Sequence, residues 1–124
     1  MKVYENFLVY KGTHYSVYFH AENAEVSEAY GQYKQCDMPT RANLLYLAQR
    51  LGDHGRIYDL TKFRIENKKY KIYTFKAKHH RFFCFFTENK LIIITSSYRK
   101  SGQKVDRKEL WKAIKIQELY SKGG

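Results

Sequence analysis

Four short runs of apolar and aromatic residues in the second half of the chain constrain the fold more than any other feature. They span residues 62–66, 70–77, 81–87 and 91–98, and only a few residues separate one run from the next. Runs rich in Phe, Tyr and Ile are typical of β-strands. Parallel neighbours need a crossover of about a dozen residues, so such short connections predict antiparallel pairing, with Glu88-Asn89-Lys90 as a tight turn. The sequence therefore predicts a β-meander of three to four strands.

The first half of the chain predicts a β element followed by two helices. Residues 2–20 are rich in Val, Tyr and Phe and are split at Gly12, which indicates a strand or a hairpin. Residues 21–36 carry apolar side chains at helical spacing. A second helix is expected from the Asp37-Met38-Pro39 start to Gly52 as its stop. A short turn between these helices predicts a helical hairpin.

The chain ends in a further predicted helix. Asp106 and Glu109 have the spacing of a capping box, and the residues after them give a wide apolar face. The expected fold class is α+β: an N-terminal strand or hairpin, a helical hairpin, an antiparallel β-meander of three to four strands and a C-terminal helix.

Length and composition predict one compact domain over residues 1–124. The chain has 124 residues with one proline, seven glycines and 44% hydrophobic residues. Cys36 and Cys84 could form at most one disulfide, which excludes a scaffold held together by disulfides. No apolar run is long enough to span a membrane, and the first residues lack the pattern of a signal peptide. We therefore expect a cytoplasmic protein without a membrane partner.

Positive charge is concentrated in the same part of the chain as the meander. The chain carries 23 Lys and Arg against 12 Asp and Glu, a net charge of +11. Residues 62–112 hold fifteen basic and four acidic side chains, whereas residues 1–61 hold six basic and seven acidic ones. A cationic half beside a near-neutral half is typical of proteins that bind RNA or DNA. The alternatives are a plain solvated surface, an acidic protein partner or a membrane surface, although no amphipathic basic helix supports the last.

The motif content excludes most catalytic chemistries. His79, His80 and Cys84 lack the spacing of a zinc site, and no acidic cluster predicts magnesium. No glycine-rich nucleotide loop or nucleophile elbow is present, so we expect neither a metal nor a cofactor. A basic set that includes Lys, His and Tyr suits metal-independent cleavage of a phosphodiester. In that reaction cations stabilise the phosphoryl oxygens and two further groups move protons.

Alternation along the strand that ends near Lys78 predicts which side chains would face such a ligand. Phe75 and Ala77 are expected to face the core, and Lys76 and Lys78 the opposite side. Neighbouring cations lower the pKa of a lysine, and a histidine titrates near neutral pH. Lys76, Lys78 and His79 are therefore candidates for the general base, each with a solvated surface side chain as the alternative.

The C-terminal half resembles a known family of toxins. A turn with His79-His80-Arg81 leads into an aromatic-rich strand, residues 82–86, and a hairpin then leads into an Ile-rich strand, residues 91–94. The loop Tyr98-Arg99-Lys100-Ser101-Gly102-Gln103-Lys104 follows, before a helix that contains Glu109 and Ala113. Over about residues 60–120 this order resembles the toxins of the RelE/HigB superfamily, in particular the phage-associated HigB-like branch of the RelE/ParE superfamily.

The resemblance implies both a fold and an activity. Toxins of this superfamily are similar in fold to small microbial ribonucleases, and most cut mRNA in the ribosomal A site. The implied function is thus a ribosome-dependent mRNA endonuclease, an mRNA interferase, that inhibits translation. Its partners would be the ribosome, mRNA and a cognate antitoxin of the helix-turn-helix type.

Site residues carried over from the resemblance lie on the turn and on the loop. Arg81 is expected to clamp the scissile phosphate, and Arg99 and Lys100 to stabilise charge on the transferred phosphoryl group. Tyr98 would stack on a base or act as an acid, or else it packs against the last helix. Gln103 and Lys104 would hold the RNA backbone or a base. Together with three further cations they make up the expected RNA-binding set: Lys71, Gln103, Lys104, Arg107 and Lys108.

Two other functions fit the same residues. A ParE-like toxin of the gyrase-poisoning branch would dock its basic face on a complex of protein and DNA. A non-enzymatic RNA- or DNA-binding module would use aromatic side chains such as Tyr70, Tyr73 and Phe75 as stacking platforms.

Overall fold

A computed structural model describes residues 1–122 and shows an α+β fold with one six-stranded sheet. A short 3-10 turn, η1 (Glu5–Phe7), precedes the hairpin of β1 (Leu8–Lys11) and β2 (Ser16–Phe19). Helices α1 (Glu28–Lys34) and α2 (Met38–His54) follow. The rest comprises β3 (Phe63–Asn67), β4 (Ile72–Ala77), β5 (His80–Phe86), β6 (Leu91–Arg99) and α3 (Arg107–Lys122). The general α+β class that the sequence predicts is confirmed.

The sheet is larger than the predicted meander and is mixed rather than antiparallel. Its strand order is β1-β2-β6-β5-β4-β3, and β3 to β6 pair antiparallel in chain order. The N-terminal hairpin joins the same sheet because β2 pairs parallel with β6, from Ser16 opposite Leu91 to Phe19 opposite Ile94. Parallel pairing is possible because the chain between these strands is long enough to cross the sheet.

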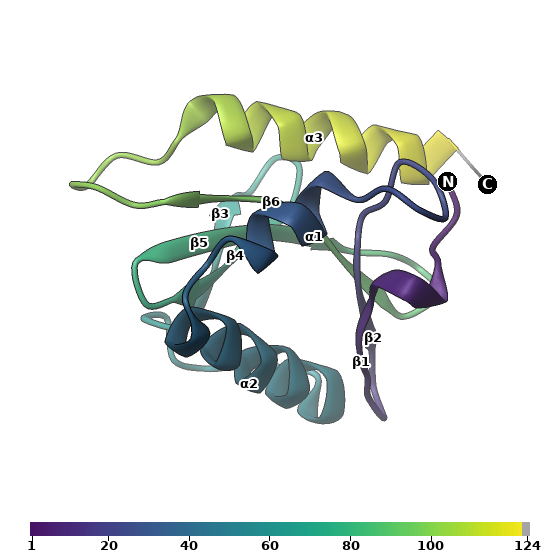
Figure 1. Cartoon of the computed structure of the whole chain (residues 1–124), viewed down its shortest axis with the longest axis horizontal. Helices are drawn as coiled ribbons and strands as arrows, with labels where there is room; N and C mark the ends of the chain where they lie inside the picture. The colour runs from purple at the N-terminus through teal and green to yellow at the C-terminus, as the bar shows by residue number, and fades with distance from the viewer. Residues whose placement is uncertain (123–124) are drawn as a thin grey trace.

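Helices cover both faces of the sheet (Figure 1). On one face α2 buries Leu44, Leu47 and Leu51 in a core that includes Phe75 and Phe82. On the other face α3 buries three residues against the sheet, Ala113, Ile114 and Ile116, in a core that includes Phe83, Phe85 and Ile93. Consecutive aromatic residues of β5 therefore lie in two different cores. Among residues 1–122 no helix is long and apolar enough to cross a membrane.

Helix α1 is shorter than predicted and lies apart from α2. Residues 21–27 precede the helix, because Ser27 caps it by accepting a hydrogen bond from the Tyr30 amide at 3.0 Å. Asn23 holds a turn upstream, where its side chain accepts from the amides of Glu25 and Val26. In place of a helical hairpin, α1 packs beside β6 while α2 lies under the sheet (Figure 1).

Helix α2 begins as predicted and ends later than predicted. The Asp37 carboxylate caps it by accepting from the Thr40 amide at 3.0 Å. The helix continues through Gly52 to His54, and Gly55 ends it in the left-handed conformation, with φ of 79°. Gly52 instead permits close contact with the β1–β2 turn, where its carbonyl accepts from the amides of His14 and Tyr15 at 2.8 and 2.9 Å.

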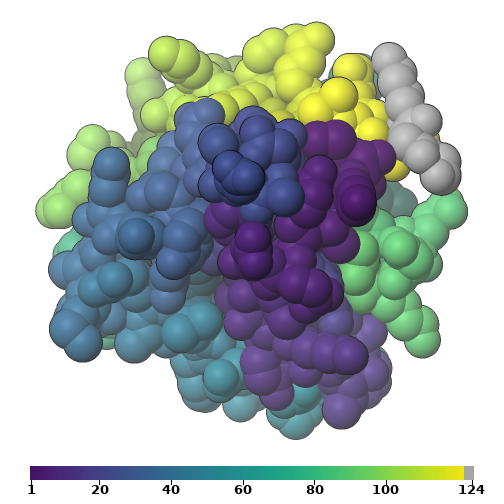
Figure 2. All heavy atoms as spheres, turned by 45° about the vertical axis from the view of Figure 1, so that its right-hand side comes forward, coloured from purple at the N-terminus to yellow at the C-terminus, as the bar shows by residue number. Residues whose placement is uncertain are grey.

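The two ends of the described chain lie together. The Met1 amino group donates to the Leu119 carbonyl at 3.4 Å, and Figure 2 shows the first residues beside the end of α3. Deeper in the molecule, His20 Nδ1 and the Tyr120 hydroxyl are 2.9 Å apart. The C-terminal helix is thus fixed to the N-terminal hairpin at this end of the sheet.

Candidate active site on one face of the sheet

Three predicted site residues lie side by side because of the strand register. Lys76 on β4 is paired with Arg81 on β5, and Arg81 is paired with Tyr98 on β6. Side chains paired across neighbouring strands point to the same face of a sheet. This is the face that α3 covers, since Phe83, two residues after Arg81, packs in the core under α3. The three side chains therefore form one row across the sheet.

Two residues of β3 that the sequence analysis did not single out, Arg64 and Glu66, lie beside this row, beginning two residues along the strand from the position opposite Lys76. Arg64 is paired with Thr74 on β4, and the Thr74 hydroxyl donates to Glu66 Oε1 at 3.5 Å. Arg64 Nη2 lies 3.9 Å from Glu66 Oε2. The Arg64 side chain is 48% exposed and that of Glu66 13%. Glu66 is therefore a largely buried carboxylate next to a row of cations.

We call this set of side chains the basic cluster. Its members come from β3, β4, β5, β6 and the residue after β6: Arg64, Glu66, Lys76, Arg81, Tyr98 and Lys100. Helix α3 packs on β5 and β6, so the cluster lies where the sheet emerges from under the helix. A ligand could reach it from the side of β3.

Arg81 is held in place by its own turn. Its Nη1 donates to the carbonyls of Lys78 at 2.9 Å and His80 at 3.0 Å. Its Nε is buried and has no hydrogen-bond partner among the described residues. Burial lowers the pKa of Arg81, and the neighbouring Tyr98 and Glu66 oppose that shift. Because an unpaired buried donor is costly, the geometry favours an anionic ligand at this guanidinium.

Lys76 is the half-buried cation of the row. Burial lowers its pKa, and the charges of Arg64, Arg81 and Lys100 lower it further, whereas Glu66 opposes this effect. The Lys100 amide donates to the His79 carbonyl at 2.7 Å, which fixes the start of the loop after β6 beside the β4–β5 turn. Four cations and one carboxylate thus share a small region.

Tyr98 combines packing with access to the cluster. Its ring centroid lies 5.6 Å from that of Phe83, and the ring packs at the margin of the core under α3. Burial raises the pKa of Tyr98, a backbone hydrogen bond from Asp106 opposes the shift, and the Glu66 charge adds to it. The hydroxyl is thus protonated and able to donate at neutral pH. The expected packing against the last helix and a role in the cluster are compatible.

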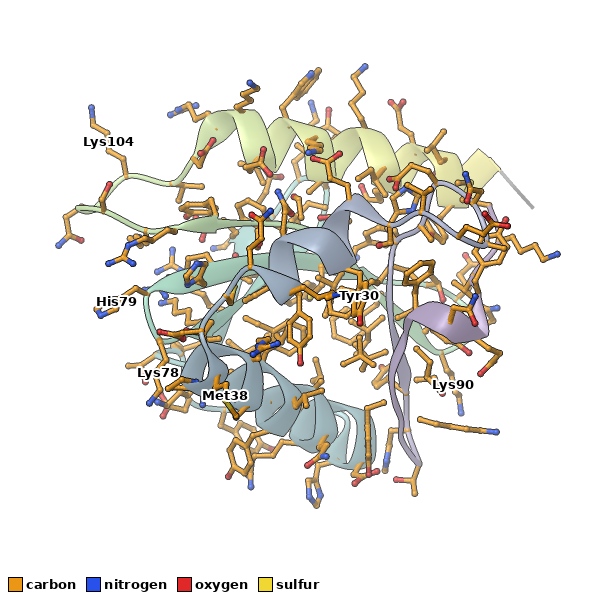
Figure 3. All side chains as sticks on the ribbon, viewed as in Figure 1. Tyr30, Met38, Lys78, His79, Lys90 and Lys104 are labelled. Carbon is orange, nitrogen blue, oxygen red and sulfur yellow. The ribbon has the colours of Figure 1, made fainter. Side chains whose placement is uncertain are left out.

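The structure does not bring the other three predicted catalytic residues into the basic cluster. Lys78 has a positive φ of 56° and lies with His79 in the exposed β4–β5 turn (Figure 3). Arg99 is paired with His80 and projects to the face of α2, where both lie near Asp37. Adjacent residues of a strand point to opposite faces, so Arg99 and Tyr98 project from opposite sides of β6.

The predicted RNA-binding residues divide into two groups. Gln103 and Lys104 are exposed in the loop after β6, and Arg107 and Lys108 are exposed in the first turn of α3. Figure 3 shows Lys104 at the same end of the molecule as Lys78 and His79, opposite Lys90. Lys71 lies elsewhere, in the turn between β3 and β4.

A simple signal could have identified Arg64 and Glu66. Both stand in a predicted strand, residues 62–66, and positions two apart on a strand share a face. The net charge of residues 62–112 is strongly positive, so it gives no indication that a carboxylate lies among the cations.

No group of three or more His, Cys, Asp or Glu within residues 1–122 could hold a metal ion. Comparison of the sequence with protein-family models and with curated proteins gives no match.

Proposed function

We propose that the protein is a metal-independent endoribonuclease that cuts mRNA. The observation that carries this proposal is the row of Lys76, Arg81 and Tyr98 on three adjacent strands, with the buried Arg81 Nε unpartnered. A phosphate between these side chains would receive a hydrogen bond from Arg81 and positive charge from Lys76. Such a preorganised set of donors is what phosphoryl transfer requires.

The proposed reaction is attack of the RNA 2′-hydroxyl on the adjacent phosphorus. The 2′ oxygen forms a bond to phosphorus while the bond to the 5′ oxygen breaks, which leaves a 2′,3′-cyclic phosphate and a 5′-hydroxyl. The 2′ proton passes to a general base, and a general acid protonates the departing 5′ oxygen. No metal is needed, because Arg81, Lys76 and Lys100 stabilise the charge on the phosphoryl oxygens.

We assign the base to Glu66 and the acid to Tyr98. A carboxylate is the group that ordinarily accepts a proton at neutral pH, whereas a lysine amine is ordinarily protonated there, although burial and neighbouring cations lower the pKa of Lys76. Lys76 therefore serves as a cation in this scheme. Tyr98 lies across Arg81 from Lys76, and its phenol is protonated at neutral pH.

The biological setting follows from the family resemblance. We propose that mRNA in the ribosomal A site is the substrate and that the protein is a toxin neutralised by a cognate antitoxin. The exposed cations of the loop after β6 and of the first turn of α3 suit contact with ribosomal RNA. They also suit an acidic antitoxin segment that would occlude the same surface.

Primer extension on an mRNA translated in vitro, with and without ribosomes, tests the proposal. Wild-type protein should give ribosome-dependent stops within codons, and Arg81→Ala should remove them while the fold stays intact. Lys11→Ala changes an exposed cation of β1 and should leave the stops unchanged. Intact message with normal translation would refute the nuclease. Arrest of DNA synthesis in cells would then favour the gyrase-poisoning alternative.

A further inference from the structure

A cavity of about 660 Å³ opens at the edge of the sheet, away from the row of Lys76, Arg81 and Tyr98. It lies between β3, the chain that follows α2 and the β3–β4 turn. Its volume is in the range of pockets that hold small ligands. The reaction proposed above does not use it.

The inner wall of the cavity is aromatic and preformed. The Phe86 ring lies edge-on to Tyr15 and to Tyr73, with centroid distances of 5.1 and 5.0 Å. Tyr73 is parallel to Phe63, with an interplanar angle of 2° and centroids 5.3 Å apart. Tyr15, Tyr73 and Phe86 are only half-buried, so each keeps ring surface that a planar ligand can contact.

The rim of the cavity is cationic. Arg56, Arg64 and Lys71 line it, and no acidic side chain of the described residues does. Arg56 is fixed by Tyr58, whose hydroxyl accepts from its Nη1 at 2.6 Å and whose ring lies 5.4 Å from the guanidinium. Leu60 also lines the cavity and is 68% exposed. Aromatic rings surrounded by cations suit a ligand with a flat base and a phosphate.

Arg64 connects the cavity to the basic cluster, because it lines the first and belongs to the second. A strand of RNA whose phosphate lies at Arg64 can therefore place one nucleotide in the cluster and a neighbouring one in the cavity. We infer that the cavity binds an unpaired base of single-stranded RNA beside the nucleotide that is cut. The inference rests on the proposed function, since that function supplies RNA as the ligand.

Binding of an RNA that cannot be cut tests the cavity separately from catalysis. The probe is a short fluorescein-labelled oligoribonucleotide with 2′-O-methyl ribose throughout, measured by fluorescence anisotropy. Tyr73→Ala should weaken its binding by about tenfold through lost stacking. Since Tyr73 packs on Phe63 and Phe86, this variant could lose its fold, so circular dichroism accompanies it and the exposed Arg56→Ala provides a second test. Arg56→Ala should lower the salt dependence of binding by about one phosphate contact.

Arg50→Ala is the matched control. Arg50 forms the same kind of pair with a tyrosine, 5.8 Å from the ring of Tyr46, but lies outside the cavity lining. Its removal should leave the affinity and the salt dependence unchanged. If Arg56→Ala and a folded Tyr73→Ala bind RNA as wild-type protein does, the inference is wrong.

Photocrosslinking locates the base directly. The same oligonucleotide carrying 5-iodouracil should crosslink to Tyr15, Tyr73 or Phe86, and crosslinks confined to other parts of the chain would overturn the inference. Cleavage of the unmodified oligonucleotide on ribosomes is assayed in parallel. Crosslinking in the cavity without cleavage would refute the nuclease and support base binding in the cavity. Cleavage at the wild-type rate by the cavity variants would support the nuclease and refute base binding in the cavity.

Discussion

At the scale of single residues, the geometry of Arg81 separates a structural task from a chemical one. Its Nη1 is used by the carbonyls of Lys78 and His80, which fix the plane of the guanidinium. Its Nε is buried and has no hydrogen-bond partner among the described residues. A planar guanidinium whose Nη1 is held by two carbonyls keeps a defined orientation, which suits recognition of a phosphate oxygen by its remaining nitrogen, Nη2. The strand register places Lys76 and Tyr98 on either side of Arg81.

Glu66→Gln separates the base from the cations. The amide has the shape of the carboxylate but cannot accept the 2′ proton, so single-turnover cleavage on ribosomes should slow by about 10²–10⁴-fold. Binding of uncleavable RNA should persist, because a negative charge is removed from a cationic site. Lys76→Arg is the companion variant. It keeps the charge and should retain most activity if Lys76 acts as a cation. A Lys76→Arg protein as slow as Glu66→Gln would instead assign the base to Lys76.

At the scale of elements, the sequence predicted those parts of the fold whose signals are local. The meander follows from four apolar runs with short connections, and the start of α2 follows from the Asp37 cap. The parallel pairing of β2 with β6 could not be predicted, because it joins residues more than seventy positions apart. The sequence predicts Gly52 as a helix stop, whereas in the structure Gly52 lies within α2 and permits close contact with the distant β1–β2 turn.

The same distinction applies to the candidate site. The sequence placed Lys76 and Arg81 together correctly because a short turn joins β4 and β5. Strand alternation places Arg99 on the opposite face of β6 from Tyr98, so its predicted role in phosphate binding has no contact with the cluster to support it. Arg64 was missed because its approach to the cluster depends on the pairing of β3 with β4.

The contact between the β1–β2 turn and α2 predicts a large effect of a small substitution. A Cβ at Gly12 would lie 2.3 Å from the carbonyl carbon of Gly52, which is backbone and cannot move aside easily. Gly12→Ala should therefore lower the free energy of unfolding by about 1–3 kcal/mol. Gly31→Ala, inside α1 with no atom within 4 Å of the added Cβ, should raise it by about 0.5–1 kcal/mol. Urea unfolding of both variants checks this, and equal effects would contradict the close contact.

The start of α3 carries cations where a helix favours anions. Asp106 caps the helix by accepting from the Glu109 amide at 3.0 Å, yet Lys108 stands exposed in the first turn. Lys108→Glu should raise the free energy of unfolding by about 0.3–1 kcal/mol. The same change should weaken RNA binding if this turn faces RNA. Lys11→Glu makes the same change of charge on β1 and should give neither effect. Loss of stability in Lys108→Glu would contradict the dipole argument.

At the scale of the whole molecule, the sheet joins a near-neutral half to a cationic half. The first 61 residues supply the N-terminal hairpin, α1 and α2, and the remaining residues supply the meander, α3 and most of the positive charge. Polar contacts tie the halves together near the start of α3. Gln32 of α1 accepts from the Ser97 amide at 2.8 Å and donates to Glu109 at 3.3 Å, and Glu28 pairs with Lys112. The basic surface is thus supported by the part of the chain whose net charge is close to zero.

His20 makes this connection depend on pH. It is 3% exposed at the end of β2, its Nδ1 lies 2.9 Å from the Tyr120 hydroxyl, and its Nε2 lies 3.6 Å from Glu22. Burial lowers the pKa of His20, and the Glu22 charge opposes the shift only in part. Burial raises the pKa of Tyr120, so the hydroxyl stays protonated and donates to the neutral imidazole. His80 shows the same direction, since burial and then Arg99 lower its pKa.

These shifts fix the sign of the pH dependence of stability. Because the folded protein binds protons at His20 and His80 less readily than the unfolded chain does, unfolding takes up protons below about pH 6.5. The free energy of unfolding should therefore fall as the pH decreases from about 7.5 to about 5, by at most about 1.4 kcal/mol per pH unit for each histidine. Urea unfolding across this range measures the slope. His20→Gln should reduce that slope, and the combination with His80→Gln should reduce it further. A wild-type protein equally stable at both ends of the range would show that these imidazoles are not held neutral by the fold.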